Sequence, residues 1–209
     1  MARTNPLIKV GILLVVLTVV GFLFMRSLRD SRAVPYTVEP EELRTWTLVL
    51  EPESGPNSPM LTLQASPDLG LGLFRQAFTR AGESLARPRV PAIPIVLHDE
   101  FNRLLAGRVT PDALLATVRN TGIESAPPAL RCMAYRRVSE PGGTRQLYFV
   151  MFEAEAFRRI RADIGVDANA LSPVLFVAGA DGDFNRWLPL RADPDADCVA
   201  PIATTGPVP

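Results

Sequence analysis

The sequence predicts an α+β domain that follows an N-terminal transmembrane helix. Three observations lead to this fold class. An uninterrupted apolar run extends from Val10 to Met25, strand-like and helix-like segments alternate after it without a regular βα order, and residues 140–143 (EPGG) form a strong hairpin signal. We therefore expect a mixed, largely antiparallel sheet of about five or six strands, with helices packed on one face.

The apolar run suggests a membrane anchor. With Lys9 counted as snorkelling, residues 7–25 form a helix that, at a rise of about 1.5 Å per residue, spans roughly the hydrocarbon thickness of a bilayer. A cleaved signal peptide, with cleavage after residues 31–33 (SRA), and a buried core helix are the two alternatives. Arginines between positions 26 and 32 resemble a stop-transfer flank and favour the uncleaved anchor.

The anchor implies an orientation and a domain organisation. The charges flanking the run are nearly balanced, but the short leader leaves the large C-terminal part to be translocated, so we expect a cytoplasmic N-terminus and an extracytoplasmic domain. The expected segments are a leader at 1–6, a transmembrane helix at 7–25, a juxtamembrane linker at 26–42, the α+β domain at 43–191 and a tail at 192–209. The tail is acidic and rich in proline, so we expect it to be disordered unless Cys198 is held in place.

Local signals predict the elements of the domain. The start at residues 66–68 (SPD) combines a capping hydroxyl, a proline where no N–H is needed and an acid at the positive end of the helix dipole. The expected helices are 66–87, 99–106, 110–121 and 153–164. The expected strands are 43–50, 60–65, 93–98, 129–139, 144–152, 174–178 and 186–190.

His98 is the only histidine and the one weak candidate for catalysis. It ends a predicted strand and precedes Asp99 and Glu100, a composition compatible with a general base. A structural interpretation competes, because neighbouring strand residues point to opposite faces and Asp99 is a good N-cap for the next helix.

Two other motifs fail on their context. Residues 82–86 approach the serine-hydrolase pattern, but Ser84 lies late in a predicted helix rather than in a strand-to-helix turn. Residues 181–185 imitate the opening of a calcium loop, but Arg186 and Ala192 stand where glycine and glutamate are needed. We therefore expect a turn there, and neither a metal site nor a cofactor.

The two cysteines, Cys132 and Cys198, permit one disulfide in an exported domain. Their separation excludes a CxxC redox motif. A single histidine also cannot complete a zinc site of the two-cysteine, two-histidine type with them.

The zero net charge hides a basic segment at 131–161 and an acidic one at 162–209. The basic segment can dock an anionic surface or an envelope protein complex, or the two segments can pair with each other in the fold. The candidate partner-binding residues are Arg136, Arg137, Arg158 and Arg159. Aromatic residues are interleaved with them, but zero net charge and the expected location argue against nucleic acid.

These observations favour a non-catalytic interaction or assembly module at the membrane surface. The alternative is an exported enzyme or a small-ligand-binding domain whose pocket residues come from separate loops and leave no linear motif.

Overall fold

The computed structural model divides the chain into two compact units, residues 1–34 and 35–209. In the first unit it describes a helix over 13–23 with exposed apolar side chains. The residues that the structure describes are 13–23, 26, 34–52, 55, 57–81, 84–140, 143–188 and 191–205.

The transmembrane prediction is corrected by this structure. Among the residues described, no helix has the length and apolarity needed to cross a bilayer. The helix over 13–23 extends for roughly 16 Å at about 1.5 Å per residue, about half of the hydrocarbon thickness. The other positions of the expected 7–25 span lie outside the described residues. The expected single-pass, extracytoplasmic localisation depended on that span and is not supported.

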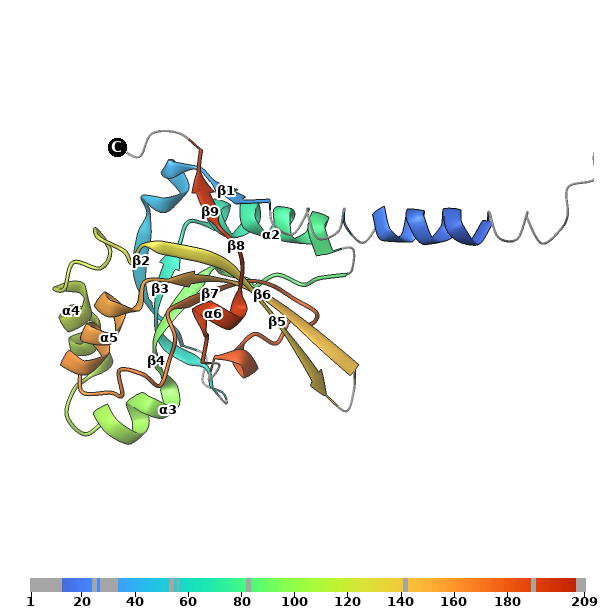
Figure 1. The fold of residues 1–209 in the computed structure, drawn as a ribbon. Coiled ribbons are helices and arrows are strands. Elements are labelled where there is room, and N and C mark those ends of the chain that lie inside the picture. The colour runs from blue at the N-terminus through green and yellow to red at the C-terminus, as the bar shows by residue number, and fades with distance from the viewer. Residues whose placement is uncertain are drawn as a thin grey trace, which may run out of the picture. The chain divides into compact units, whose positions relative to one another are not determined.

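The second unit is an α+β domain, and the strands of its described residues form three sheets (Figure 1). The first is antiparallel, in the order β2 (Trp46–Leu50), β3 (Pro59–Ala65), β4 (Ala92–Leu97). The second is also antiparallel, in the order β7 (Val174–Gly179), β6 (Gly143–Phe152), β5 (Leu130–Glu140), β8 (Cys198–Ala200). The third pairs β1 (Tyr36–Val38) in parallel with β9 (Ile202–Thr204).

The expected single sheet of five or six strands is therefore wrong, although the α+β class is right. One reason lies at the outer edge of β4. Pro94 has no N–H to donate, and the carbonyl of Ile95 accepts a hydrogen bond from Arg161 instead of from another strand. Strands β4 and β7 lie near each other, and the bridge between Ala86 and Gly179 continues β7 outside the named strands.

The helices pack at separate places rather than on one face. Helix α2 (Pro67–Ala81) lies against β7 and β1, α4 (Pro111–Arg119) against β2, α5 (Ala154–Asp163) against β4, and α6 (Pro194–Asp197) against β5. Four short elements complete the domain: η1 (Pro40–Leu43), α3 (His98–Glu100), the π-helical η2 (Phe101–Leu105) and η3 (Asn185–Trp187). Consequently the expected strand at 43–50 begins only at Trp46, and η3 occupies the start of the expected strand at 186–190.

Both ends of the domain are more ordered than expected. The expected linker contains β1 and η1, and the expected disordered tail contains α6, β8 and β9. The tail is held by the disulfide at Cys198 and by the pairing of its last strand with β1.

The core lies between the strands and the helices that cover them. Trp46 of β2 meets Phe152 of β6 edge to face, with ring centroids 5.7 Å apart, and so connects the two larger sheets. The largest fully buried apolar side chains are Leu61, Leu63, Leu69, Leu73, Ile93, Ile95, Leu114, Met133, Leu147, Phe149 and Phe157.

One charged side chain, Arg161 of α5, lies fully inside this core with 0% exposure. Its Nη1 and Nη2 donate to the two carboxylate oxygens of Glu100 at 3.2 and 2.5 Å. Its Nε and Nη2 donate to the carbonyl of Asp167 at 3.0 and 2.7 Å, and Nη1 donates to the carbonyl of Ile95 at 2.5 Å. Because the Glu100 carboxylate also accepts from the Leu97 N–H at 3.0 Å, this network joins α5, β4 and α3.

Candidate functional site

A groove of about 560 Å³ opens beside the three-stranded sheet. Its volume is within the range of about 300–1,000 Å³ that is usual for small-molecule sites, and it exceeds the cavities beside η1 and η2. The groove is lined by Glu51, Pro52, Ser58, Pro59, Thr62, Pro88, Arg89, Val90, Ala92, Pro94, Phe176, Gly182, Asp183, Phe184, Asn185 and Leu188.

Glu51 is the most firmly positioned charged group in this lining. It directly follows β2, its N–H donates to the carbonyl of Met60 at 2.8 Å, and its own carbonyl is 3.1 Å from Nε2 of His98. Its Oε1 accepts from Oγ1 of Thr62 at 3.2 Å and from Nε2 of Gln64 at 2.8 Å. Both the backbone and the carboxylate of this half-buried residue are therefore fixed before any ligand arrives.

The apolar part of the groove centres on two phenylalanines. Phe176 of β7 is buried, and the half-buried ring of Phe184 stacks on it with centroids 5.9 Å apart and an interplanar angle of 30°. Further apolar lining comes from Pro59, Pro94 and Leu188. The groove thus combines an aromatic surface with a positioned carboxylate.

Two glycines allow the loops on either side of the groove to approach the domain closely. A Cβ on Gly179 would lie 3.2 Å from both the carbonyl oxygen of Asp181 and Cε1 of Phe184, closer than most real contacts. A Cβ on Gly70 of α2 would lie 2.8 Å from Cβ of Pro91, which real Cβ atoms essentially never show. Any side chain at either position would shift the adjacent loop, and with it the groove lining.

The segment 181–185 forms part of this lining rather than a cation loop. Asp181 is ion-paired with Arg145, and Nη1 of Arg186 lies 3.7 Å from its Oδ2. In the described part of the chain, no group of three or more histidine, cysteine, aspartate or glutamate side chains is arranged to hold a metal ion.

His98 lies at the start of α3, behind the groove lining. Its ring contacts the carbonyl of Glu51, and its own N–H donates to the carbonyl of Ser58 at 3.0 Å. The neighbouring carboxylates serve other roles, because Asp99 is exposed and Glu100 pairs with Arg161. The side chain of Glu100, rather than Asp99, caps the helix start by accepting from the N–H of Leu97. Through its ring contact with the Glu51 carbonyl, His98 thus helps to hold the backbone of Glu51 in place.

The two cysteines lie on the neighbouring strands β5 and β8 and are joined by a disulfide, with Cα atoms 5.8 Å apart. Sequence separation gave no indication of this proximity. It arises because β8 returns antiparallel to β5, with Ala134 opposite Cys198.

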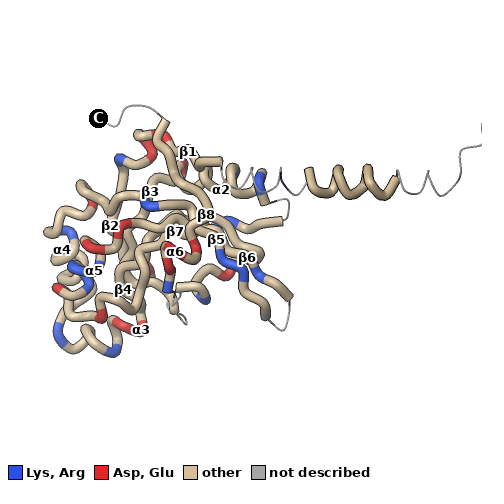
Figure 2. Tube along the Cα trace, viewed as in Figure 1, with Lys and Arg blue, Asp and Glu red and all other residues tan. Residues whose placement is uncertain are grey.

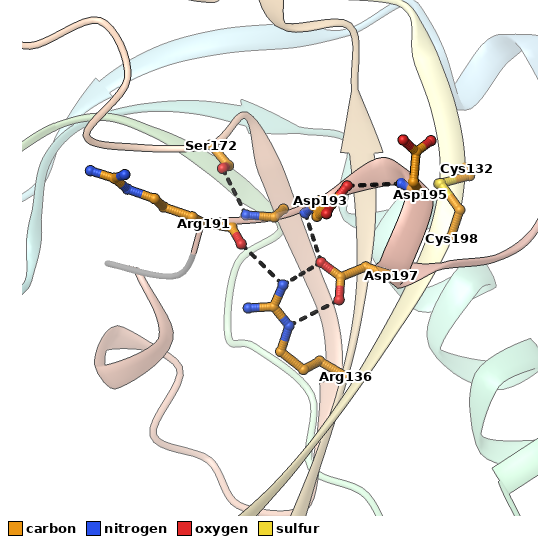
Figure 3. Close-up of polar contacts among 9 residues, drawn as sticks. Cys132, Arg136, Ser172, Arg191, Asp193, Asp195, Asp197 and Cys198 are labelled. Atoms are coloured by element: carbon orange, nitrogen blue, oxygen red, sulfur yellow. Dashed lines mark hydrogen bonds and ion pairs between the residues drawn. A yellow bond between two sulfur atoms is a disulfide. The ribbon is translucent and has the colours of Figure 1, made fainter.

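Arg136 is engaged within the fold (Figure 3). Its Nε donates to Oδ1 of Asp197 at 2.9 Å, its Nη2 pairs with Oδ2 of the same carboxylate, and Nη2 also donates to the carbonyl of Arg191 at 3.0 Å. The Asp193 N–H donates to Asp197 Oδ2 at 2.8 Å, which completes the network. At Arg136 the basic segment 131–161 therefore pairs with the acidic segment 162–209 within the fold, as one of the two expectations for these charges proposed.

The other three candidate arginines do not join Arg136 in one patch. Arg137 is exposed on β5, whereas Arg158 and Arg159 are exposed on α5, where Arg159 lies 3.6 Å from Glu155. Figure 2 shows α5 and the far end of the β5–β6 hairpin on opposite sides of the domain.

Sequence reasoning missed Glu51 because its partners come from β3 and from the start of α3. The one available signal was the Thr62-x-Gln64 alternation, which places two polar side chains on the same face of a predicted strand. Fold and site together define an α+β domain with an open, partly aromatic groove. Comparisons with protein-family models, with curated proteins and with solved structures gave no match to this chain.

Proposed function

We propose that this protein is a non-catalytic small-ligand-binding protein and that the groove is its binding site. The observation that carries the proposal is the positioned carboxylate of Glu51 in a groove of ligand size beside the stacked rings of Phe176 and Phe184. Apolar surface with a few fixed polar groups is the usual composition of such sites.

Preorganisation supports binding at this place. A ligand that meets a fixed carboxylate and a packed ring pair does not have to order those groups, which would cost about 0.5–1.5 kcal/mol for each flexible side chain. Ser58, which lines the groove and carries a hydroxyl, donates to the carbonyl of Gly55 at 2.9 Å and accepts from its N–H at 2.8 Å. With its hydroxyl held in this way, Ser58 is not poised as a nucleophile, which favours binding over catalysis.

The hypothesis of a protein-interaction module remains an untested prediction. The four arginines proposed for that module lie at two separate places, on β5 and on α5 (Figure 2), and Arg136 is already paired with Asp197. A partner would therefore have to contact Arg137 on β5 independently of the two arginines on α5.

The proposal is tested with a library of small fragments and the full-length protein, using NMR chemical shifts to locate binding. We expect the shifted resonances to cluster at residues 58–62, 88–94 and 176–188. Phe184→Ala should weaken binding of these fragments about tenfold, equivalent to about 1.4 kcal/mol. Phe78→Ala is the matched control, because Phe78 is 48% exposed on α2 and does not line the groove. Fragments that scatter over the surface, or that bind equally well to both variants, would contradict the proposal.

A further inference from the structure

We infer that the ligand of the groove is a small organic cation, with an ammonium or guanidinium group attached to an apolar body. This inference rests on the proposed binding site and concerns the chemistry that the site selects. It is carried by the way in which the Glu51 carboxylate is held.

Both hydrogen bonds recorded for the Glu51 side chain fall on Oε1, from Thr62 and Gln64. Among the described residues Oε2 has no recorded partner, so it is available to accept from a ligand. Hydrogen bonds between a charged donor and a carboxylate are about twice as strong as neutral ones. Partial burial of Glu51 in the groove also reduces the screening that water would provide. A cationic N–H donor is therefore the head group that this oxygen favours most.

Arg89 is the opposing charge in the lining, and it is less well prepared to select an anion. Its side chain is exposed, and no recorded contact among the described residues fixes it. Ordering a flexible arginine side chain costs rotamer entropy, whereas the Glu51 carboxylate is already held and loses little. Asp183 adds a second carboxylate, so among the residues that the structure describes the charged lining consists of two acids and one base.

The aromatic pair sets the rest of the ligand. Phe184 is half-buried and stacks on Phe176, so it offers an apolar surface beside the polar end of the groove. A flat or aliphatic body can pack there, and a cation near the ring face is also attracted by the negative face of the aromatic ring. The same groove disfavours a carboxylate ligand because Glu51 and Asp183 would repel it.

Three probes with a common phenyl body test the charge preference on the full-length protein: 2-phenylethylamine, 2-phenylethanol and 3-phenylpropanoate. We expect the amine to bind at least tenfold more tightly than the carboxylate at pH 7 and low salt, with the alcohol between them. Glu51→Gln should reduce the affinity for the amine to that for the alcohol, because the amide oxygen still accepts from Thr62 and Gln64 but carries no charge. Asp183→Asn, at an exposed position, should weaken amine binding about twofold.

Arg87→Gln is the matched control. Arg87 is exposed on the same loop as Arg89 but does not line the groove. It should leave all three affinities within twofold. Tighter binding of the carboxylate, weakened by Arg89→Gln, would overturn the cation inference and leave the groove as a binding site. Unchanged amine affinity in both Glu51→Gln and Asp183→Asn would overturn it as well. If neither the probes nor the fragment library shifted groove resonances, the proposed function itself would fail.

Discussion

Replacing Arg161 with methionine should destabilise the domain more than any comparable change at a surface arginine. The substitution keeps much of the buried volume but removes all five hydrogen bonds that Arg161 donates to Glu100, Asp167 and Ile95. Glu100, only 7% exposed, would retain a buried charge without its cation. Breaking a buried ion pair by removing one partner costs about 3–5 kcal/mol.

We therefore expect Arg161→Met to lower the free energy of unfolding by about 4 kcal/mol, nearly a thousandfold in the folding equilibrium. This is a large share of the roughly 5–15 kcal/mol that stabilises a typical domain. Urea unfolding at pH 7, followed by circular dichroism, measures the change through the transition midpoint. In the double variant that also carries Glu100→Gln, the loss should be smaller than the sum of the two single losses, because no unpaired charge remains.

Arg159→Met provides the matched control on the same helix. Arg159 is exposed and lies 3.6 Å from the exposed Glu155, so its replacement should change the free energy of unfolding by only about 0.5 kcal/mol or less. If Arg161→Met cost no more than Arg159→Met, with an unchanged dependence on urea, the buried network would not hold α5 to β4 as described.

Two further predictions concern the ends of the domain. Cys132→Ser should lower the free energy of unfolding by about 4 kcal/mol, because the disulfide closes a loop of 66 residues. Equal urea midpoints for the wild type with and without reductant would argue against this stabilising role of the disulfide. Burial raises the pKa of Tyr36 above its ordinary value of 10.0, although Arg80 opposes this shift. The stabilising contribution of the neutral Tyr36 side chain is therefore complete below about pH 10, and it is lost as pH rises through the higher folded-state pKa. Tyr36→Phe should therefore reduce the loss of stability at alkaline pH. An equally steep loss in the wild type and in the variant would refute the assignment of this loss to Tyr36.

Features determined by neighbouring residues were predictable from the sequence. The helix expected at 110–121 is α4, capped by the hydroxyl of Thr110, which accepts from the N–H of Ala113. The hairpin expected on either side of residues 140–143 is the β5–β6 pair, whose register runs from Leu130 opposite Phe152 to Glu140 opposite Gly143. Caps, periodicity and turn residues act over a few positions, so a single sequence contains them completely.

Features that depend on distant pairing were not predictable. Strand β1 lies in the segment that the sequence predicts to be a linker. The strand has only three residues, which is too few for the alternation of buried and exposed side chains to indicate a strand. The site is a similar case, because the position of the Glu51 carboxylate depends on the β2–β3 register, which places Thr62 opposite Val49 and Gln64 opposite Thr47. Local patterns give each strand but not its register against a partner, so the groove stays hidden until the sheet is assembled.

The parallel pairing of β1 with β9 affects the order in which the domain can be completed during synthesis. Figure 1 shows the two strands side by side, although Val38 and its partner Thr204 are separated by nearly the whole domain. At about 5–20 residues per second, β1 waits roughly ten to thirty seconds after its own synthesis for β9 to emerge. During that interval the backbone N–H and C=O groups of β1 lack the partner strand that β9 provides in the finished domain.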